Sequence, residues 1–176
     1  MTDSSLQADE FAPFYQNYVS LAGTAPIIQT LEALKHSTYL FIVSLHEDFA
    51  GHAYAPGKWT VKQLVSHMID AERIFAYRVL CISRHETQPL PGFDENEYVA
   101  NAHANLRTLH SLAEELKQVR ESNLFIFKSL TAEQWRLKGT ASNSTVSVRA
   151  LACIMAGHEL HHLNVLKQRY LNDHTR

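Results

Sequence analysis

Four long stretches of helical hydrophobic periodicity, separated by turn-rich connections, most constrain the fold of this 176-residue chain. No stretch shows a convincing strand pattern. Long amphipathic helices joined by such connections indicate an all-α protein, and the four of them predict a four-helix bundle. Because no internal repeat or second domain is visible, we expect one domain over residues 1–176, with its core at about 24–170.

Capping residues and turn signals set the expected ends of the first two long helices. The first should begin near Thr24, which can cap it ahead of a proline, and should end before Gly51. Thr60 is followed three residues later by Gln63, which is a capping-box pattern. This pattern predicts that the second long helix covers residues 61–83.

The rest of the chain is punctuated by residues that favour turns. We expect the last helix to be capped by Ser147 or by Thr145 and to continue to about Tyr170. The other expected elements are a short helical segment at about 11–20, an irregular connection at 88–95, a third long helix from about 105 to 130, a short turn at 131–135 and a loop at 139–147.

The composition is that of a soluble globular protein, with 45% hydrophobic and 19% charged residues. A formal net charge of −2 without a basic tract argues against nucleic-acid binding. The absence of a long apolar run or of an N-terminal leader pattern predicts no membrane contact and a cytoplasmic location. Cys81 and Cys153 are expected to be reduced and buried as small hydrophobic residues.

The last helix contains three histidines within five positions. On a helical wheel, His162 falls near the centre of the apolar arc and His158 lies close beside it, one turn away. His161 falls near the edge of the arc. Because His158 and His161 are three residues apart, a His158–His161 pair is an alternative. Neutral imidazoles are common ligands of divalent transition metals, so an inward-facing pair predicts a metal site.

A third ligand must come from another helix, and His67 is the leading candidate. It lies in an apolar stripe of the second long helix at three- and four-residue spacing. The alternative for His67 is a hydrogen-bonded histidine of the core. Two features argue against a zincin-type site with Glu159 as general base after His158. The α+β context of zincins is absent, and Glu159 is expected toward the outside of the arc. The remaining histidines lack a partner at ligand spacing or lie in loops, surface positions or the tail: His36, His46, His52, His85, His103, His110 and His174.

Four short motifs, in this order and separation, resemble the DinB-like (DinB/YfiT-like) metalloenzyme superfamily. They are PGKWTVKQL at 56–64, HMIDAERIF at 67–75, PLPGFD at 89–94 and AGHELHHL at 156–163. The resemblance extends over about residues 26–170. It implies a four-helix bundle in which three histidines hold a metal, and these correspond to His67, His158 and His162.

Three protein ligands would leave part of the ion open to a water or a substrate, as in catalytic sites. Zinc or nickel is the leading ion, and iron or manganese is also compatible with all-nitrogen ligation. Asp70 and Glu72 are candidate catalytic residues that could orient an imidazole or accept a proton, and the alternative is a solvated helix face. Asp94 and Glu95 could overhang the site, although a plain polar loop is the simpler interpretation.

The resulting prediction is a metal-dependent enzyme with a small-molecule substrate, of the thiol-dependent S-transferase type or the hydrolase type. In the transferase version the cosubstrate would be a low-molecular-weight thiol. The alternatives are a non-catalytic stress-response or interaction bundle with a stabilising metal, and a metal-free interaction module. The resemblance and the expected exposure of aromatic residues such as Tyr77 also predict a homodimer.

Overall fold

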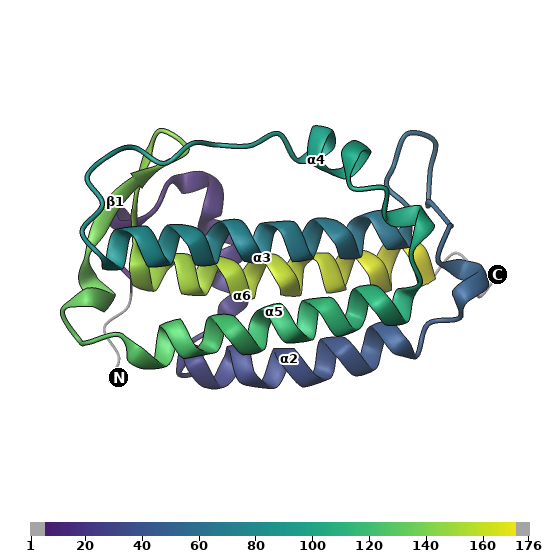
Figure 1. Cartoon of the computed structure of the whole chain (residues 1–176), viewed down its shortest axis with the longest axis horizontal. Helices are drawn as coiled ribbons and strands as arrows, with labels where there is room; N and C mark the ends of the chain where they lie inside the picture. The colour runs from purple at the N-terminus through teal and green to yellow at the C-terminus, as the bar shows by residue number, and fades with distance from the viewer. Residues whose placement is uncertain (1–5, 172–176) are drawn as a thin grey trace.

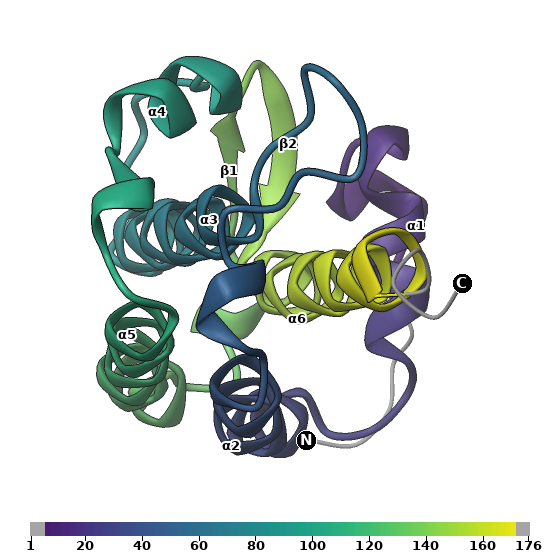
Figure 2. The ribbon, with the colours of Figure 1, turned by 90° about the vertical axis from the view of Figure 1, so that its right-hand side faces the viewer.

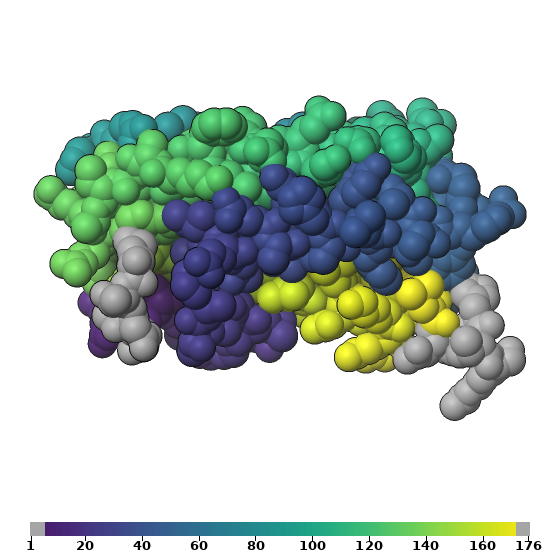
Figure 3. All heavy atoms as spheres, turned by 90° about the horizontal axis from the view of Figure 1, so that it is seen from below, coloured from purple at the N-terminus to yellow at the C-terminus, as the bar shows by residue number. Residues whose placement is uncertain are grey.

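A computed structural model describes residues 6–171 and confirms the four-helix bundle. Seen end-on, the helices form a ring in which α2 packs on α5, α5 on α3, and α3 on α6, with a looser contact from α6 back to α2 (Figure 2). The view from below shows α2 between α5 and the C-terminal part of α6 (Figure 3). The four long helices are α2 (Ile27–Val43), α3 (Val61–Ser83), α5 (Leu109–Ser129) and α6 (Val148–Val165).

Helices α3 and α5 run in the same direction, so the chain must cross the length of the bundle between them (Figure 1). The connection of residues 84–108 makes this crossing over the outer side of α3. It carries the short helix α4 (Glu95–Asn101) and a 3-10 turn (Ala104–Leu106), and both contact α3. The α4 helix begins after Asp94, whose carboxylate accepts hydrogen bonds from the amides of Asn96 and Glu97.

The N-terminal segment forms a fifth layer on the outside of α6 (Figure 2). Its helix α1 (Gln16–Ala22) packs along α6, after two 3-10 turns (Ala8–Glu10 and Pro13–Tyr15). The buried carboxylate of Glu10 accepts hydrogen bonds from the Ser147 hydroxyl and the Arg149 guanidinium, both at the start of α6. This contact anchors the segment to the bundle.

The stretch at 138–147 is a β-hairpin, so the expectation of a loop without strands is wrong. Strand β1 (Lys138–Ala141) pairs antiparallel with β2 (Ser144–Ser147), and Ala141 faces Ser144. The two turn residues, Ser142 and Asn143, both have positive φ angles of 50° and 61°, as a tight hairpin turn requires. The hairpin packs on α3 so closely that a Cβ on Gly139 would lie 2.6 Å from Ile82 Cγ1.

The expected helix ends are confirmed in part. The capping box places α3 at 61–83 as predicted, and Ser147, not Thr145, caps α6. The first long helix ends at Val43, well before Gly51, and Thr24 does not cap it, because its N-cap is Pro26. The remaining short elements are two 3-10 turns (Glu47–Phe49 and Gln134–Arg136) and a π-helical continuation of α6 (Leu166–Leu171).

The core lies between the four long helices and continues under the hairpin and the N-terminal segment. Both cysteines are free thiols, as expected, but they are only partly buried. Among residues 6–171, no helix combines the length and the hydrophobicity needed to span a bilayer. Residues 1–5, at which a leader would start, and His174 lie outside the described part of the chain.

Candidate metal centre

The bundle brings His67, His158 and His162 together. His67 lies in the second turn of α3, whose start is fixed by the reciprocal bonds of the capping box, at 3.2 Å from Gln63 N to Thr60 Oγ1 and 2.9 Å from Thr60 N to Gln63 Oε1. His158 and His162 lie one turn apart on α6, on the side that faces α3. Capped starts reduce fraying and fix the position of each histidine along its helix.

The three imidazoles converge through their Nε2 atoms. His158 Nε2 lies 3.0 Å from His67 Nε2 and 3.1 Å from His162 Nε2, and the three ligand atoms lie within 4.8 Å of one another. Nitrogens bound to one tetrahedral zinc ion at about 2.0–2.1 Å would be separated by roughly 3.3 Å. The spacing of the nitrogens therefore fits a single bound ion.

Hydrogen bonds alone do not satisfy this arrangement. A ring nitrogen has one in-plane lone pair, so His158 Nε2 can accept from only one of its two neighbours. The buried Nδ1 atoms of His67 and His162 have no hydrogen-bond partner among residues 6–171. A cation that takes one lone pair from each Nε2 atom would satisfy these three atoms at once, although it would not pair the two Nδ1 atoms.

Burial keeps the three imidazoles neutral, as metal ligands must be. Burial lowers the pKa of His67 to about 4, although the carboxylate of Glu95 acts in the opposite direction. Burial, and then the neighbouring His67 and His161, lower the pKa of His162 to about 3. The pKa of His158 lies well below its ordinary value, first because of burial and then because of the other histidines.

Aromatic rings enclose the cluster on several sides. The ring of Trp59 lies 4.8 Å from that of His67, and the rings of Tyr18 and Phe75 lie 5.5 and 5.6 Å from that of His158. His161 is partly exposed and packs between Tyr18 and His162, outside the group of converging nitrogens. The alternative pairing of His158 with His161 is therefore not the one that the fold forms.

A cavity of about 280 Å³ adjoins the cluster at His162. Its walls are mainly aromatic and aliphatic, with one lysine, one amide and one further imidazole. The hydroxyl of Tyr170 donates a 2.7 Å hydrogen bond to the carbonyl of Trp59, which fixes the loop that forms one wall. The lining residues are Tyr54, Gly57, Lys58, Trp59, Leu64, Asn96, His161, His162, Val165 and Tyr170.

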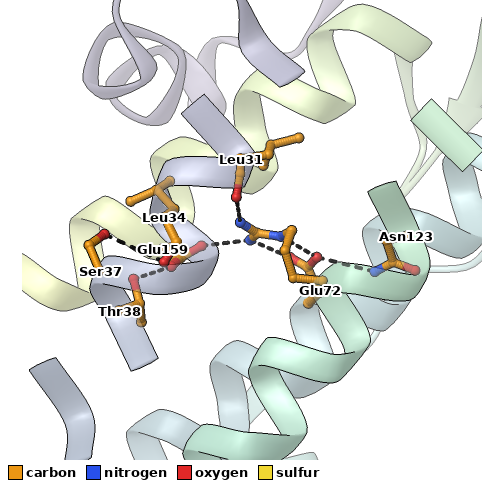
Figure 4. Close-up of polar contacts among 8 residues, drawn as sticks. Leu31, Leu34, Ser37, Thr38, Glu72, Asn123 and Glu159 are labelled. Atoms are coloured by element: carbon orange, nitrogen blue, oxygen red, sulfur yellow. Dashed lines mark hydrogen bonds and ion pairs between the residues drawn. The ribbon is translucent and has the colours of Figure 1, made fainter. Parts of the chain in front are cut away.

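The two carboxylates proposed from the sequence as catalytic, Asp70 and Glu72, occupy different environments. Glu72 is buried in an ion pair with Arg120 and also accepts a 3.1 Å hydrogen bond from Asn123 (Figure 4). Asp70 is half-buried, and burial raises its pKa although Arg73 acts in the opposite direction. Within residues 6–171, neither carboxylate forms a hydrogen bond to a histidine of the cluster.

Two other carboxylates differ from what the sequence suggests. Glu159 is buried and not on the outside of the apolar arc, because Arg120 and Thr38 both bind its carboxylate. Glu95, at the first position of α4, is exposed and close enough for its charge to act on both His67 and Tyr18. Because Asp94 caps α4, Glu95 stands at the start of this helix, on the connection that crosses over α3.

The comparisons with known proteins agree with this architecture. A protein of Oceanobacillus iheyensis that is named as a candidate metal-dependent hydrolase is 27% identical over 125 residues, which cover 70% of this chain and 72% of that protein. YfiT from Bacillus subtilis, described as a probable metal-dependent hydrolase with an unusual four-helix bundle topology, superposes with a TM-score of 0.75 at 17% identity, covering 84% of this chain and 86% of YfiT. The DinB-like protein YjoA from Bacillus subtilis gives a TM-score of 0.58 at 22% identity, covering 85% and 92% of the two chains.

The family model of the DinB superfamily matches residues 30–166, which include all three converging histidines, the crossover connection and the hairpin. This match extends over well more than half of the chain. The chain belongs to the DinB superfamily.

Proposed function

We propose that this protein is a metal-dependent hydrolase in which His67, His158 and His162 hold one divalent transition ion. The convergence of the three Nε2 atoms beside a cavity is the observation that carries this proposal. Such an ion, when bound, supplies Lewis acidity and lowers the pKa of a water or thiol that it binds. Zinc or nickel is the expected ion, with iron or manganese as alternatives, and part of its coordination sphere is expected to be open to the substrate.

The cavity suits a small-molecule substrate. Its volume of about 280 Å³ is near the lower end of the range for ligand pockets. Trp59 and Tyr54 offer flat apolar surfaces, whereas Lys58 and Asn96 offer hydrogen-bond donors. A substrate with an apolar body and one polar or anionic end therefore fits these walls.

Glu95 is proposed as the proton acceptor of the site. Glu72 and Glu159 are engaged with Arg120, and Asp70, the other carboxylate suggested by the sequence, stays a second candidate for this role. Glu95 is adjacent to Asn96 of the cavity wall, and within residues 6–171 it is the one carboxylate whose charge acts on the pKa of His67. A Glu95 Oε atom would take the proton from the attacking water and return it to the leaving group, which leaves the carboxylate unchanged after each turnover.

The thiol-dependent S-transferase is the second version of the same site. In that version a low-molecular-weight thiol replaces water, and Glu95 takes the proton from sulfur instead of from oxygen. A cavity wall with Lys58 would suit an anionic thiol such as glutathione or bacillithiol. A stress-response role, a homodimer, a cytoplasmic location and a single domain over residues 1–176 also stay predictions.

Elemental analysis and activity assays of the tag-free protein test the proposed function. We expect about one equivalent of a transition metal after loading with Zn²⁺ or Ni²⁺, and turnover of small esters or amides, or of a thiol with an electrophile. His162→Ala should abolish both metal binding and turnover, whereas the exposed His36→Ala should change neither. Metal binding without turnover in all assays would favour the stabilising-metal alternative. Less than about a tenth of an equivalent would favour the metal-free module.

A further inference from the structure

A single guanidinium connects all four long helices at the centre of the bundle. Arg120 of α5 binds both carboxylate oxygens of Glu72 on α3, at 2.6 and 2.8 Å. It also donates to Glu159 of α6 at 2.6 Å and to the carbonyl of Leu31 on α2 at 3.2 Å. Figure 4 shows Glu72, Glu159 and Leu31 converging on this point from three helices.

The charges of this triad, Glu72–Arg120–Glu159, are fully removed from solvent. The three residues are between 1% and 4% exposed. The remaining acceptor sites are also used, because Asn123 donates to Glu72 and Thr38 donates to Glu159. A buried charge is tolerated only when its partners meet it in good geometry, so sliding one helix against another would leave a charge unpaired.

The two carboxylates stand on the helices that carry the converging histidines. Glu159 follows His158 directly on α6, and Glu72 lies five residues after His67 on α3. The triad and the His158 ring also line the same tightly packed part of the interior. A slip of α3 by one turn would move His67 by about 5.4 Å along the bundle, which would separate it from His158.

We infer that Arg120 is the positioning residue of the metal centre. By binding Glu72 and Glu159 at the same time, it fixes the axial register of α3 against α6 and so holds His67 against His158. Apolar packing drives the helices together but is less selective for one register than directional ion pairs are. The inference rests on the proposed metal site for its affinity measurement, whereas the register itself is a property of the metal-free protein.

The test replaces the whole triad, because removing one member alone would leave an unpaired buried charge. The variant E72M/R120M/E159L keeps similar volumes and is expected to remain helical, with an unfolding midpoint near that of the unmodified protein. Its Zn²⁺ affinity, measured by competition with a chelator, should fall about 10- to 100-fold. The visible absorption spectrum of bound Co²⁺ should also change, which a role in stability alone would not produce.

The control removes a partly exposed ion pair that joins α2 and α5 and contains no residue of α3 or α6. Glu32 and Lys128 form this pair at 2.6 Å, and E32M/K128M should leave the Zn²⁺ affinity and the Co²⁺ spectrum unchanged. If the triple variant does not fold, Arg120→Lys serves instead, because a lysine keeps the charge but cannot bind two carboxylates with a rigid fork. The same loss of Zn²⁺ affinity is expected for it.

A crystal structure of the metal-free triple variant decides the inference independently of metal binding. We expect the 3.0 Å separation between the Nε2 atoms of His67 and His158 to lengthen. An unchanged separation, or Zn²⁺ affinity and a Co²⁺ spectrum equal to those of the unmodified protein, would show that Arg120 does not position the site. Failure of the unmodified protein to bind metal would overturn the proposed function instead. The separation between the Nε2 atoms of His67 and His158 would then still test whether Arg120 sets the register.

Discussion

The backbone carbonyl oxygen of Tyr18 lies 1.8 Å from the position that a Cβ atom would take on Gly157. Only a glycine therefore permits α1 to lie so close to α6. The close approach also brings the ring of Tyr18 to 5.5 Å from that of His158. One missing methyl group thus allows the N-terminal segment to cover this side of the histidine cluster.

Gly157→Ala should be strongly destabilising for this reason. The obstructing atoms are backbone atoms of α1, which cannot move as a flexible side chain does. We expect the free energy of unfolding to fall by about 3 kcal/mol, measured by urea denaturation, together with weaker Zn²⁺ binding. Gly51→Ala is the control, since no atom lies within 4 Å of its Cβ position, and it should be nearly neutral. Equal stability of the two variants would contradict the close contact.

Glu95→Gln tests the proton acceptor without removing a metal ligand. We expect kcat to fall by about 10²- to 10⁴-fold, because an amide cannot accept the proton, while the Zn²⁺ affinity stays near its original value. Glu97→Gln, on the same short helix and also exposed, is the control and should retain activity. Full activity of Glu95→Gln would assign proton transfer to another group.

The metal-free protein should lose stability as the pH falls below neutrality. The folded pKa of His67, about 4, lies below its ordinary value of 6.5, so the unfolded chain binds more protons between these values. The stabilising contribution is therefore complete above pH 6.5 and is lost as the pH falls toward 4. It amounts to about 3 kcal/mol for this residue. Urea denaturation at several pH values measures the loss, and His67→Gln should reduce its slope.

Thr60→Ala tests the cap that sets the start of α3. Loss of the hydroxyl removes the acceptor for the Gln63 amide, so we expect a loss of about 1 kcal/mol in unfolding free energy. Thr60→Ser keeps the acceptor and should retain most of the stability. Thermal denaturation followed by circular dichroism compares the two variants, and an equal loss in both would argue against the cap.

Sequence patterns over a few residues correctly predicted the start of α3 and the histidine pair of α6. The capping box gave the start of α3 correctly, because its bonds join residues three apart, and the helical periodicity of the following residues gave its end at Ser83. The four-residue spacing of His158 and His162 was sufficient to place both rings on one side of α6. Periodicity made His67 the leading candidate for the third ligand while leaving a core role open, and the resemblance to a family pointed to the same residue.

Long-range contacts account for what the sequence did not predict. The strands at 138–147 are four residues each, and their partner surface on α3 cannot be deduced from the local composition. Glu159 appeared to face outward because its partner, Arg120, is 39 positions away in the sequence. The charge of Glu95 acts on His67 because the chain returns over α3, a path that no local pattern specifies, so the sequence left a plain polar loop as the simpler interpretation of Asp94 and Glu95.

The crossover of residues 84–108 separates two tasks that most bundles combine in the same helices. The three converging imidazoles belong to α3 and α6, whereas Glu95 and Asn96 belong to α4, in a connection that lies outside the four long helices (Figure 1). Replacing this connection by that of another family member would therefore change the substrate preference and leave the three buried histidines in place. Such chimaeras would allow substrate preference to be redesigned through residues 84–108 alone.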